Sequence, residues 1–329
     1  MSKNYPLKCY PFFKIIIVLV FSFSTRSFSQ VQFVDSNLPI LLINTDIDTN
    51  TSQPLEITDE PKVLATMKII RRPDGTRNYL TDQNSAEFLN YNGRIKIELR
   101  GSSSMELPKK SYSLTTVKSD NTSNNNVSIL GMPSENDWIL NSLAFDPSLI
   151  RDYLSYDISR KLGNYASRTQ YCEVILNGDY IGLYIFQEKI KANANRVDVA
   201  KIEKTDNSLN NLTGGYITKA DRPDINEPPT WVMEDTNFVH VLPKPENATP
   251  EQTAYIKGEF DRFSDNLYNY DLENGYQTII DVPSFVDFML VNELSSNADA
   301  YQYSTFFHKD RGGKLRAGPI WDLNLSFGS

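Results

Sequence analysis

The feature that most constrains the fold of this 329-residue chain is a hairpin signal near its middle. Two apolar runs rich in aromatic and β-branched residues, 171–176 and 180–186, flank the dipeptide Asn177-Gly178. Asn-Gly suits the two positive-φ positions of a tight turn between neighbouring strands. Because so short a turn joins antiparallel strands, the sequence predicts an antiparallel sheet at this point.

Strands dominate the sequence before this hairpin. Periodicity and turn residues predict strands at 38–44, 63–70, 94–100 and 110–116. The segment from Arg94 to Arg100 alternates polar and apolar residues, which indicates one solvated face. A single amphipathic helix is expected over 147–162, with Asp146 as its N-cap and Gly163 as its stop.

The second half of the chain is predicted to be mainly helical. Residues 249–252, Thr-Pro-Glu-Gln, have the form of a capping box that opens a helix to about residue 268, and Pro283 starts another to about residue 295. Strand-like segments 305–308 and 314–317 enclose turn residues and predict a second hairpin. The expected fold class is therefore α+β: a sheet with one helix, followed by helices with a short hairpin.

The charge of the chain excludes some classes of partner. Its 41 acidic and 33 basic side chains give a formal net charge of −8. Sequence-independent binding to nucleic acid or to an anionic membrane needs a basic surface, so we expect neither. Cys172 is the only cysteine after residue 29, and its apolar strand predicts a buried small hydrophobe and no internal disulfide.

The first 29 residues have the pattern of a secretory signal peptide. Lys3, Lys8 and Lys14 precede an apolar run at 15–23, and Ser27 and Ser29 give small residues at the −3 and −1 positions of a cleavage site. The run is too short to span a bilayer, so no stable transmembrane anchor is expected. We therefore predict export to the periplasm, cell surface or medium. Removal of 1–29 takes away four basic and no acidic residues and leaves a formal charge of −12.

Two carboxylates near the end of the chain are candidates for a metal-dependent site. Asp299 follows the predicted 283–295 helix, and Asp322 lies just beyond the second hairpin. A hairpin returns the chain to where it began, so these side chains should lie close together, with three more oxygen-bearing residues beside them: Asn297, Ser304 and Asn324. Carboxylate and amide oxygens suit Mg²⁺ or Mn²⁺. Surface aspartates that cap turns remain the alternative.

A second candidate feature is a loop of small residues between two strands. Ser102, Ser103 and Ser104 follow Arg100-Gly101, and Lys109 and Lys110 come next in sequence. Backbone amides in such a loop can approach phosphate, and a lysine on the following strand would reach the same phosphates. The same pattern is also typical of an ordinary solvated hairpin.

Taken in order, these parts resemble a protein kinase, although G-x-G-x-x-G, H-R-D and D-F-G are absent. The sequence resembles the CotH family, the spore-coat-protein-H-like secreted atypical kinases. The matching stretches are 100–104, 108–112, 130–133 with 137–138, 149–154, 173–178, 180–184, 188–190, 196–198, 214–216, 292–293, 297–299 and 318–322. They span roughly residues 38–329, nearly the whole chain after the predicted signal peptide.

This resemblance implies a two-lobed kinase-like fold over 30–329, with a sheet-rich lobe to about residue 190 and a helical lobe from 191. It implies transfer of the ATP γ-phosphate to a Ser or Thr hydroxyl of a protein outside the cytosol. Asp299 matches the catalytic aspartate and Asp322 the metal-binding one. Ser304 stands where kinases have a second metal-binding Asn, with Asn297 as a substitute.

The resemblance also implies where ATP would bind. The serine loop and one of Lys109 and Lys110 would meet the phosphates, and backbone groups near Glu188 would meet adenine. A kinase-like lobe continues beyond the position of Ser329, so the resemblance predicts a fragment with an incomplete second lobe.

Two other classes of function remain open at this point. The paired carboxylates could serve as the acid and base of a glycoside hydrolase, whose geometry the sequence does not set. Alternatively, a kinase-like scaffold could act as a non-catalytic surface, assembly or binding module.

Overall fold

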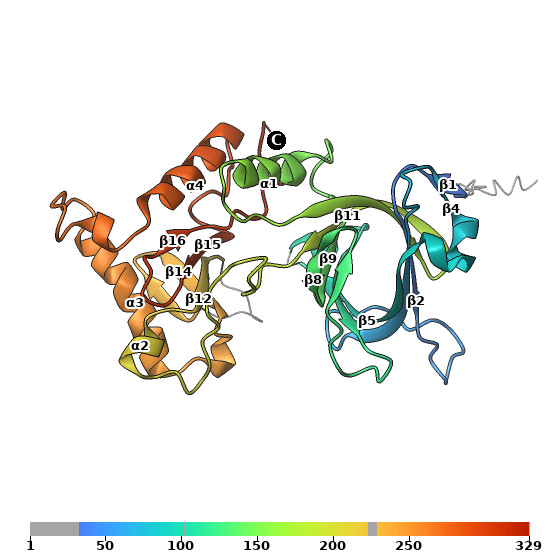
Figure 1. The fold of residues 1–329 in the computed structure, drawn as a ribbon, viewed down its shortest axis with the longest axis horizontal. Coiled ribbons are helices and arrows are strands. Elements are labelled where there is room, and N and C mark those ends of the chain that lie inside the picture. The colour runs from blue at the N-terminus through green and yellow to red at the C-terminus, as the bar shows by residue number, and fades with distance from the viewer. Residues whose placement is uncertain (1–32, 102, 223–228, 329) are drawn as a thin grey trace, which may run out of the picture. The chain divides into compact units, whose positions relative to one another are not determined.

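A seven-stranded β-barrel forms the first part of the chain (Figure 1). The computed structural model describes residues 33–101, 103–222 and 229–328, so the predicted signal peptide and Ser102 lie outside the described residues. Residues 33–329 group as one compact unit. Within the described ranges, no helix combines the length and apolar character needed to cross a bilayer.

The barrel confirms the predicted strands and adds to them. Around the barrel its strands are β10 (Thr169–Leu176), β11 (Asp179–Glu188), β9 (Asp137–Asn141), β6 (Ser111–Val117), β5 (Leu89–Arg100), β3 (Val63–Ile70) and β2 (Ile40–Thr45). The Asn177-Gly178 hairpin joins β10 and β11 as predicted, with antiparallel pairing. The pairing of β10 with β2 is parallel and closes the barrel, which the hairpin signal did not predict.

Alternation along the strands fills the barrel with apolar side chains. Trp138 of β9 stacks on Phe186 of β11, with ring centroids 5.3 Å apart, and both are fully buried. Cys172 is also buried in this core with a free thiol, as predicted. Burial raises the pKa of the Cys172 thiol, so it stays protonated and acts as a small apolar residue.

A second sheet of five strands forms the centre of the remaining chain. Its order is β13 (Trp231–Met233), β14 (Thr236–Leu242), β12 (Tyr216–Ala220), β15 (Thr305–Lys309) and β16 (Arg316–Ala317). The predicted second hairpin is present as β15 and β16. It pairs with β12 and so belongs to a larger sheet, which the sequence analysis did not predict. An aromatic cluster joins this sheet to the helix at 250–265: Trp231 and Phe238 of the sheet contact Phe260 of the helix.

Four α-helices lie in the described ranges: α1 (Arg151–Lys161), α2 (Leu209–Leu212), α3 (Pro250–Asp265) and α4 (Val282–Ser295). Smaller elements are the strand pairs β1 (Asp35–Ser36) with β4 (Asn78–Tyr79) and β7 (Val127–Ile129) with β8 (Met132–Glu135). The 3₁₀ turns are η1 (Leu80–Asn84), η2 (Ala86–Phe88), η3 (Ser103–Glu106), η4 (Pro245–Asn247) and η5 (Tyr276–Thr278). Helix α1 contacts α4 (Figure 1).

The helix starts follow local capping chemistry. Helix α3 has the predicted capping box, in which Thr249 Oγ1 accepts from the Gln252 N–H at 3.2 Å and Gln252 caps in return. The predicted start of α1 after Asp146 was wrong: the helix begins at Arg151, because Leu149 has φ of 61°, outside the right-handed helical region. The Asp146 carboxylate still accepts from the Arg151 N–H, at 2.8 Å.

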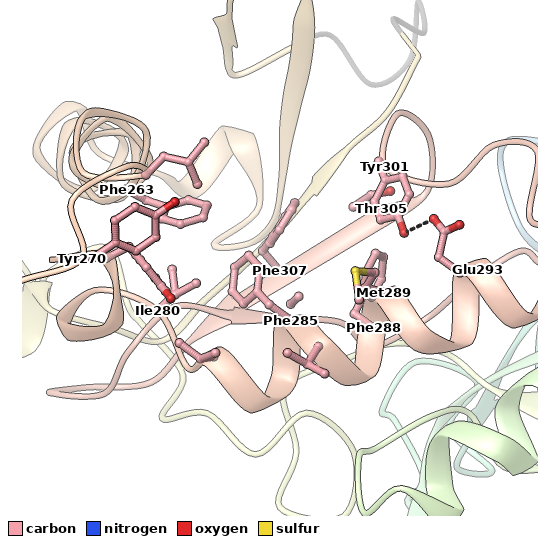
Figure 2. A pocket seen from close by; sticks show the side chains of 15 residues that line it. Phe263, Tyr270, Ile280, Phe285, Phe288, Met289, Glu293, Tyr301, Thr305 and Phe307 are labelled. Atoms are coloured by element: carbon pink, nitrogen blue, oxygen red, sulfur yellow. Dashed lines mark hydrogen bonds between the residues drawn. The ribbon is translucent and has the colours of Figure 1, made fainter. Parts of the chain in front are cut away.

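Helices α3 and α4 and strand β15 surround an apolar pocket of about 680 Å³ (Figure 2). Phe285, Phe288 and Met289 reach it from α4. Two of its lining residues form a hydrogen bond, from Tyr301 Oη to Glu293 at 2.7 Å. Tyr301 belongs to the loop that follows α4 and carries Asp299, so this loop also lines the pocket.

Candidate active site

Asp299 lies in a loop that Asn297 holds in shape. Helix α4 ends at Ser295, and its C-cap Ser296 has left-handed backbone that turns the chain. The Asn297 amide donates to Asn292 Oδ1 at 2.8 Å and accepts from the Asp299 N–H at 3.3 Å. Asn297 therefore shapes this loop. The Asp299 carboxylate is partly exposed and lies 3.6 Å from the Arg222 guanidinium.

Asp322 follows the second hairpin, and the charge of Asp299 acts on its carboxylate. It follows β16 with a left-handed φ of 59° and accepts from the Asn324 amide at 2.7 Å. Although the residue keeps exposed surface, protein atoms crowd its carboxylate, and this desolvation raises its pKa. The negative charges of Asp221 and Asp299 raise the pKa further, so Asp299 and Asp322 lie within electrostatic reach of each other.

Asp221 is a member of this cluster that the sequence analysis missed. It ends the stretch that begins with Gly214-Gly215 and continues through β12, and Lys219 Nζ lies 2.9 Å from its carboxylate. Its Oδ1 accepts from the backbone N–H of Ser304 at 3.4 Å, so Ser304 meets the cluster through its backbone. No local sequence signal marks it, because Asp221 follows directly after β12 and opens a polar stretch, 221–229, that indicates a surface loop.

Arg100 approaches the cluster from the barrel and was missed as a charged site residue. It ends β5, and its guanidinium carbon lies 5.7 Å from the ring centroid of Trp321, the residue before Asp322. The positive charges of Arg100 and Lys219 both lower the pKa of Asp322, against the stronger effect of desolvation. The cluster thus combines three carboxylates with cations from two different sheets.

The two lysines predicted to meet phosphate both donate to backbone carbonyls. Lys109 Nζ donates to the Leu183 carbonyl and lies 4.6 Å from the Tyr184 ring centroid. Burial lowers the pKa of Lys109, while the nearby Glu173 carboxylate raises it. Lys110 Nζ donates to the Met105 carbonyl. Arg100 and Lys219 are thus the cations whose charges lower the pKa of Asp322.

The serine loop turns tightly beside these lysines. Gly101 has φ of 120°, and a Cβ placed on it would lie 1.8 Å from Ser104 Oγ, so only glycine fits. Ser103 opens η3, and the Ser104 carbonyl accepts from the Leu107 N–H at 3.2 Å. The chain therefore turns tightly directly after Arg100 and continues into η3.

Glu188 is held firmly at the end of β11. Its fully buried carboxylate accepts from Arg168 at 3.0 Å and from Tyr165 Oη at 3.2 Å. Its own N–H donates to the Arg168 carbonyl and its carbonyl accepts from Ser167 Oγ. The backbone of Glu188 itself is thus occupied, and the predicted adenine contact would fall to its neighbours.

The chemistry of the cluster fits a divalent cation that is shared with phosphate. Among the described residues, no group of three or more His, Cys, Asp and Glu side chains is arranged to hold a metal ion. Mg²⁺ typically takes one or two carboxylates and completes its shell with phosphate oxygens and water. The repulsion that raises the pKa of Asp322 is the interaction that a cation beside Asp299 and Asp322 would relieve.

Comparison with known proteins adds to this geometry. A protein-family model described as CotH kinase protein matches residues 97–329, more than two thirds of the chain. The matched range contains Arg100, Lys219, Asp221, Asp299 and Asp322. A search of the curated proteins found no match to this chain.

Proposed function

This chain belongs to the CotH kinase protein family, and from that membership we propose that it transfers the ATP γ-phosphate to Ser or Thr hydroxyls of a protein. The observation that supports the proposal is that the charges of Asp299, Arg100 and Lys219 all act on the pKa of Asp322. In the proposed two-lobed arrangement, the barrel covers the nucleotide and the second sheet with α3 and α4 receives the substrate. The signal-peptide pattern of 1–29 supports a substrate outside the cytosol.

The side chains divide the reaction between them. Asp299, partly exposed on its loop, orients the attacking hydroxyl and accepts its proton as the new oxygen–phosphorus bond forms and ADP leaves. Arg100 and Lys219 offset the charge of the phosphates. Asp322 would hold the Mg²⁺ or Mn²⁺ ion, which supplies charge neutralisation at the phosphate oxygens when bound.

Ligand-induced stabilisation tests the binding half of this proposal. A ligand that binds only the folded chain raises its melting temperature, by about 5 °C at 100 times its Kd for a chain of this size. We expect Mn²⁺ with ATP to give such a rise, and Asp322→Asn to abolish it because the metal loses its carboxylate. Asp265→Asn, at an exposed position on α3, is the control. A rise that survives in Asp322→Asn would contradict this site.

Phosphate transfer to a mixed protein substrate tests the catalytic half. Asp299→Asn should keep the thermal shift and lose at least about 100-fold in transfer, because only proton acceptance and orientation are removed. A folded wild-type chain that shows neither shift nor transfer would favour a non-catalytic binding module instead.

A further inference from the structure

Helix α1 holds the turn that carries Asp322. Asp152 Oδ1 accepts from the backbone N–H of Leu323 at 2.9 Å, and Arg151 Nη1 donates to the Asn324 carbonyl at 3.1 Å. The Asp322 N–H donates to Tyr156 Oη at 3.4 Å. Residues 151 and 152 lie one turn from 156 on the same helix, so a single element contacts three consecutive residues of this turn.

The turn needs such support because its central residue has an unfavourable backbone conformation. Asp322 has φ of 59°, a region that non-glycine residues adopt with strain. The pattern of contacts fixes the backbone on both sides of this position, and the direction of the Asp322 carboxylate follows from the backbone. Without those contacts, the turn would be free to relax to a more favourable φ.

Asp152 is itself held by the barrel. It is 1% exposed, and its second oxygen accepts from the Asn141 amide at 3.1 Å. Asn141 Oδ1 accepts in turn from the Leu143 N–H at 3.0 Å, which fixes which way the amide points. One carboxylate therefore connects β9, α1 and the Asp322 turn, and both of its oxygens are used.

We infer that Asp152 is a positioning residue, which holds the Asp322 carboxylate where the metal and phosphates meet by accepting from the Leu323 N–H. What Asp322 does once positioned rests on the proposed function, whereas the positioning itself does not. A buried carboxylate with a merely structural role would lower stability when replaced and leave the metal dependence of a still-folded chain unchanged.

The variant Asp152→Asn disturbs the positioning with little change in size. Its amide NH₂ must face either the Asn141 NH₂ or the Leu323 N–H, so one hydrogen bond is lost. The double variant Asn141→Asp with Asp152→Asn reverses donor and acceptor between the two positions. The carboxylate at position 141 then accepts from the Leu143 N–H and from the amide at position 152, and the amide oxygen at position 152 accepts from the Leu323 N–H, so every bond is restored. Asn141→Ala is a milder variant that leaves the Leu323 bond in place.

Two measurements on these variants test the inference. Hydrogen exchange of the Leu323 amide in metal-free protein should become at least about tenfold faster in Asp152→Asn, because its acceptor is disturbed. The Mn²⁺ concentration that gives half of the ATP-dependent thermal shift should rise about 10-fold to 100-fold, as for other residues that orient metal ligands. The double exchange variant should restore both values, and Asn141→Ala should give a smaller effect in the same direction.

The outcomes separate this inference from the proposed function. If wild type shows no Mn²⁺-dependent shift, the proposed function fails, and Leu323 exchange alone decides the positioning. Unchanged exchange and unchanged Mn²⁺ dependence in Asp152→Asn would overturn the inference, as would a folded double variant that restores neither.

Discussion

Burial determines how the two histidines of this chain behave. His240, on β14, is 2% exposed and contacts Thr253 Oγ1 at 3.3 Å, while its Nδ1 is buried without a hydrogen-bond partner. Burial lowers the pKa of His240 to about 4 and that of His308 to about 4. At pH 7 His240 is therefore a neutral core group and His308 a neutral, half-buried one.

A pH dependence of stability follows from His240. The unfolded side chain has a pKa of about 6.5, so between pH 6.5 and 4 the unfolded chain binds a proton that the folded chain does not. Stability from this group is complete above pH 6.5 and is lost as the pH falls, by about 2 kcal/mol at pH 5. We expect His240→Phe to remove that part of the loss, measured by urea unfolding at pH 7 and pH 5. An identical loss in wild type and variant would show that His240 is already protonated in the fold.

Single residues of the site were predictable to different degrees. The prediction that Asp299 and Asp322 lie close together depends on the hairpin between them, and hairpin geometry is local. Arg100, Lys219 and Asp221 could not be predicted, because they meet only through the pairing of distant strands. Asp152 lay inside a recognised sequence stretch, but its bond to Leu323 depends on tertiary packing that periodicity does not describe.

At the scale of elements, α3 shows a sequence signal that fully determines a local structure. Thr249, Pro250 and Gln252 give the N-cap, the first helical residue and the reciprocal cap. The same N-cap also donates to Asn207 Oδ1 at 2.8 Å, which ties the helix to the preceding loop. By contrast, β12 to β14 were missed, because they are short and lie among Asn-, Gly- and Pro-rich turns that indicate loops.

The cap of α3 is expected to contribute measurably to stability. Thr249→Ala removes the acceptor for the Gln252 N–H and should cost about 1 kcal/mol of the free energy of unfolding, with a further loss from Asn207. Equilibrium urea unfolding measures this difference. The exposed first-turn variant Glu251→Gln is the control and should change stability by less than about 0.5 kcal/mol. Equal effects of the two variants would show that the cap bond contributes nothing.

At the scale of the whole molecule, the barrel does not coincide with the family match. The matched range begins at residue 97, inside β5, whereas the barrel also needs β2 and β3. The four β2 residues Ile40, Leu41, Leu42 and Ile43 are buried, none more than 7% exposed. The sequence predicted each of these strands, but the parallel pair that closes them into a barrel has no local signal.

A chain that begins at residue 97 should therefore fail to fold as the longer one does. It lacks both strands that join β10 to β5, and it leaves their apolar partners uncovered. We expect no cooperative thermal transition in near-UV circular dichroism, whereas a chain that begins at residue 33 should show one. A cooperative transition of equal midpoint in both chains would show that β2 and β3 are dispensable.

During synthesis, β2 must wait for its parallel partner β10. Ile40 pairs with Glu173, and 133 positions separate them along the chain. A ribosome that adds about 5 to 20 residues per second needs roughly 7 to 27 s to make the partner strand. During that interval β2 can pair with β3 on one edge while its other edge stays open to other nascent chains. Substitutions that slow the pairing of β10 with β2 should therefore reduce the yield of folded protein, even where they leave its melting temperature unchanged.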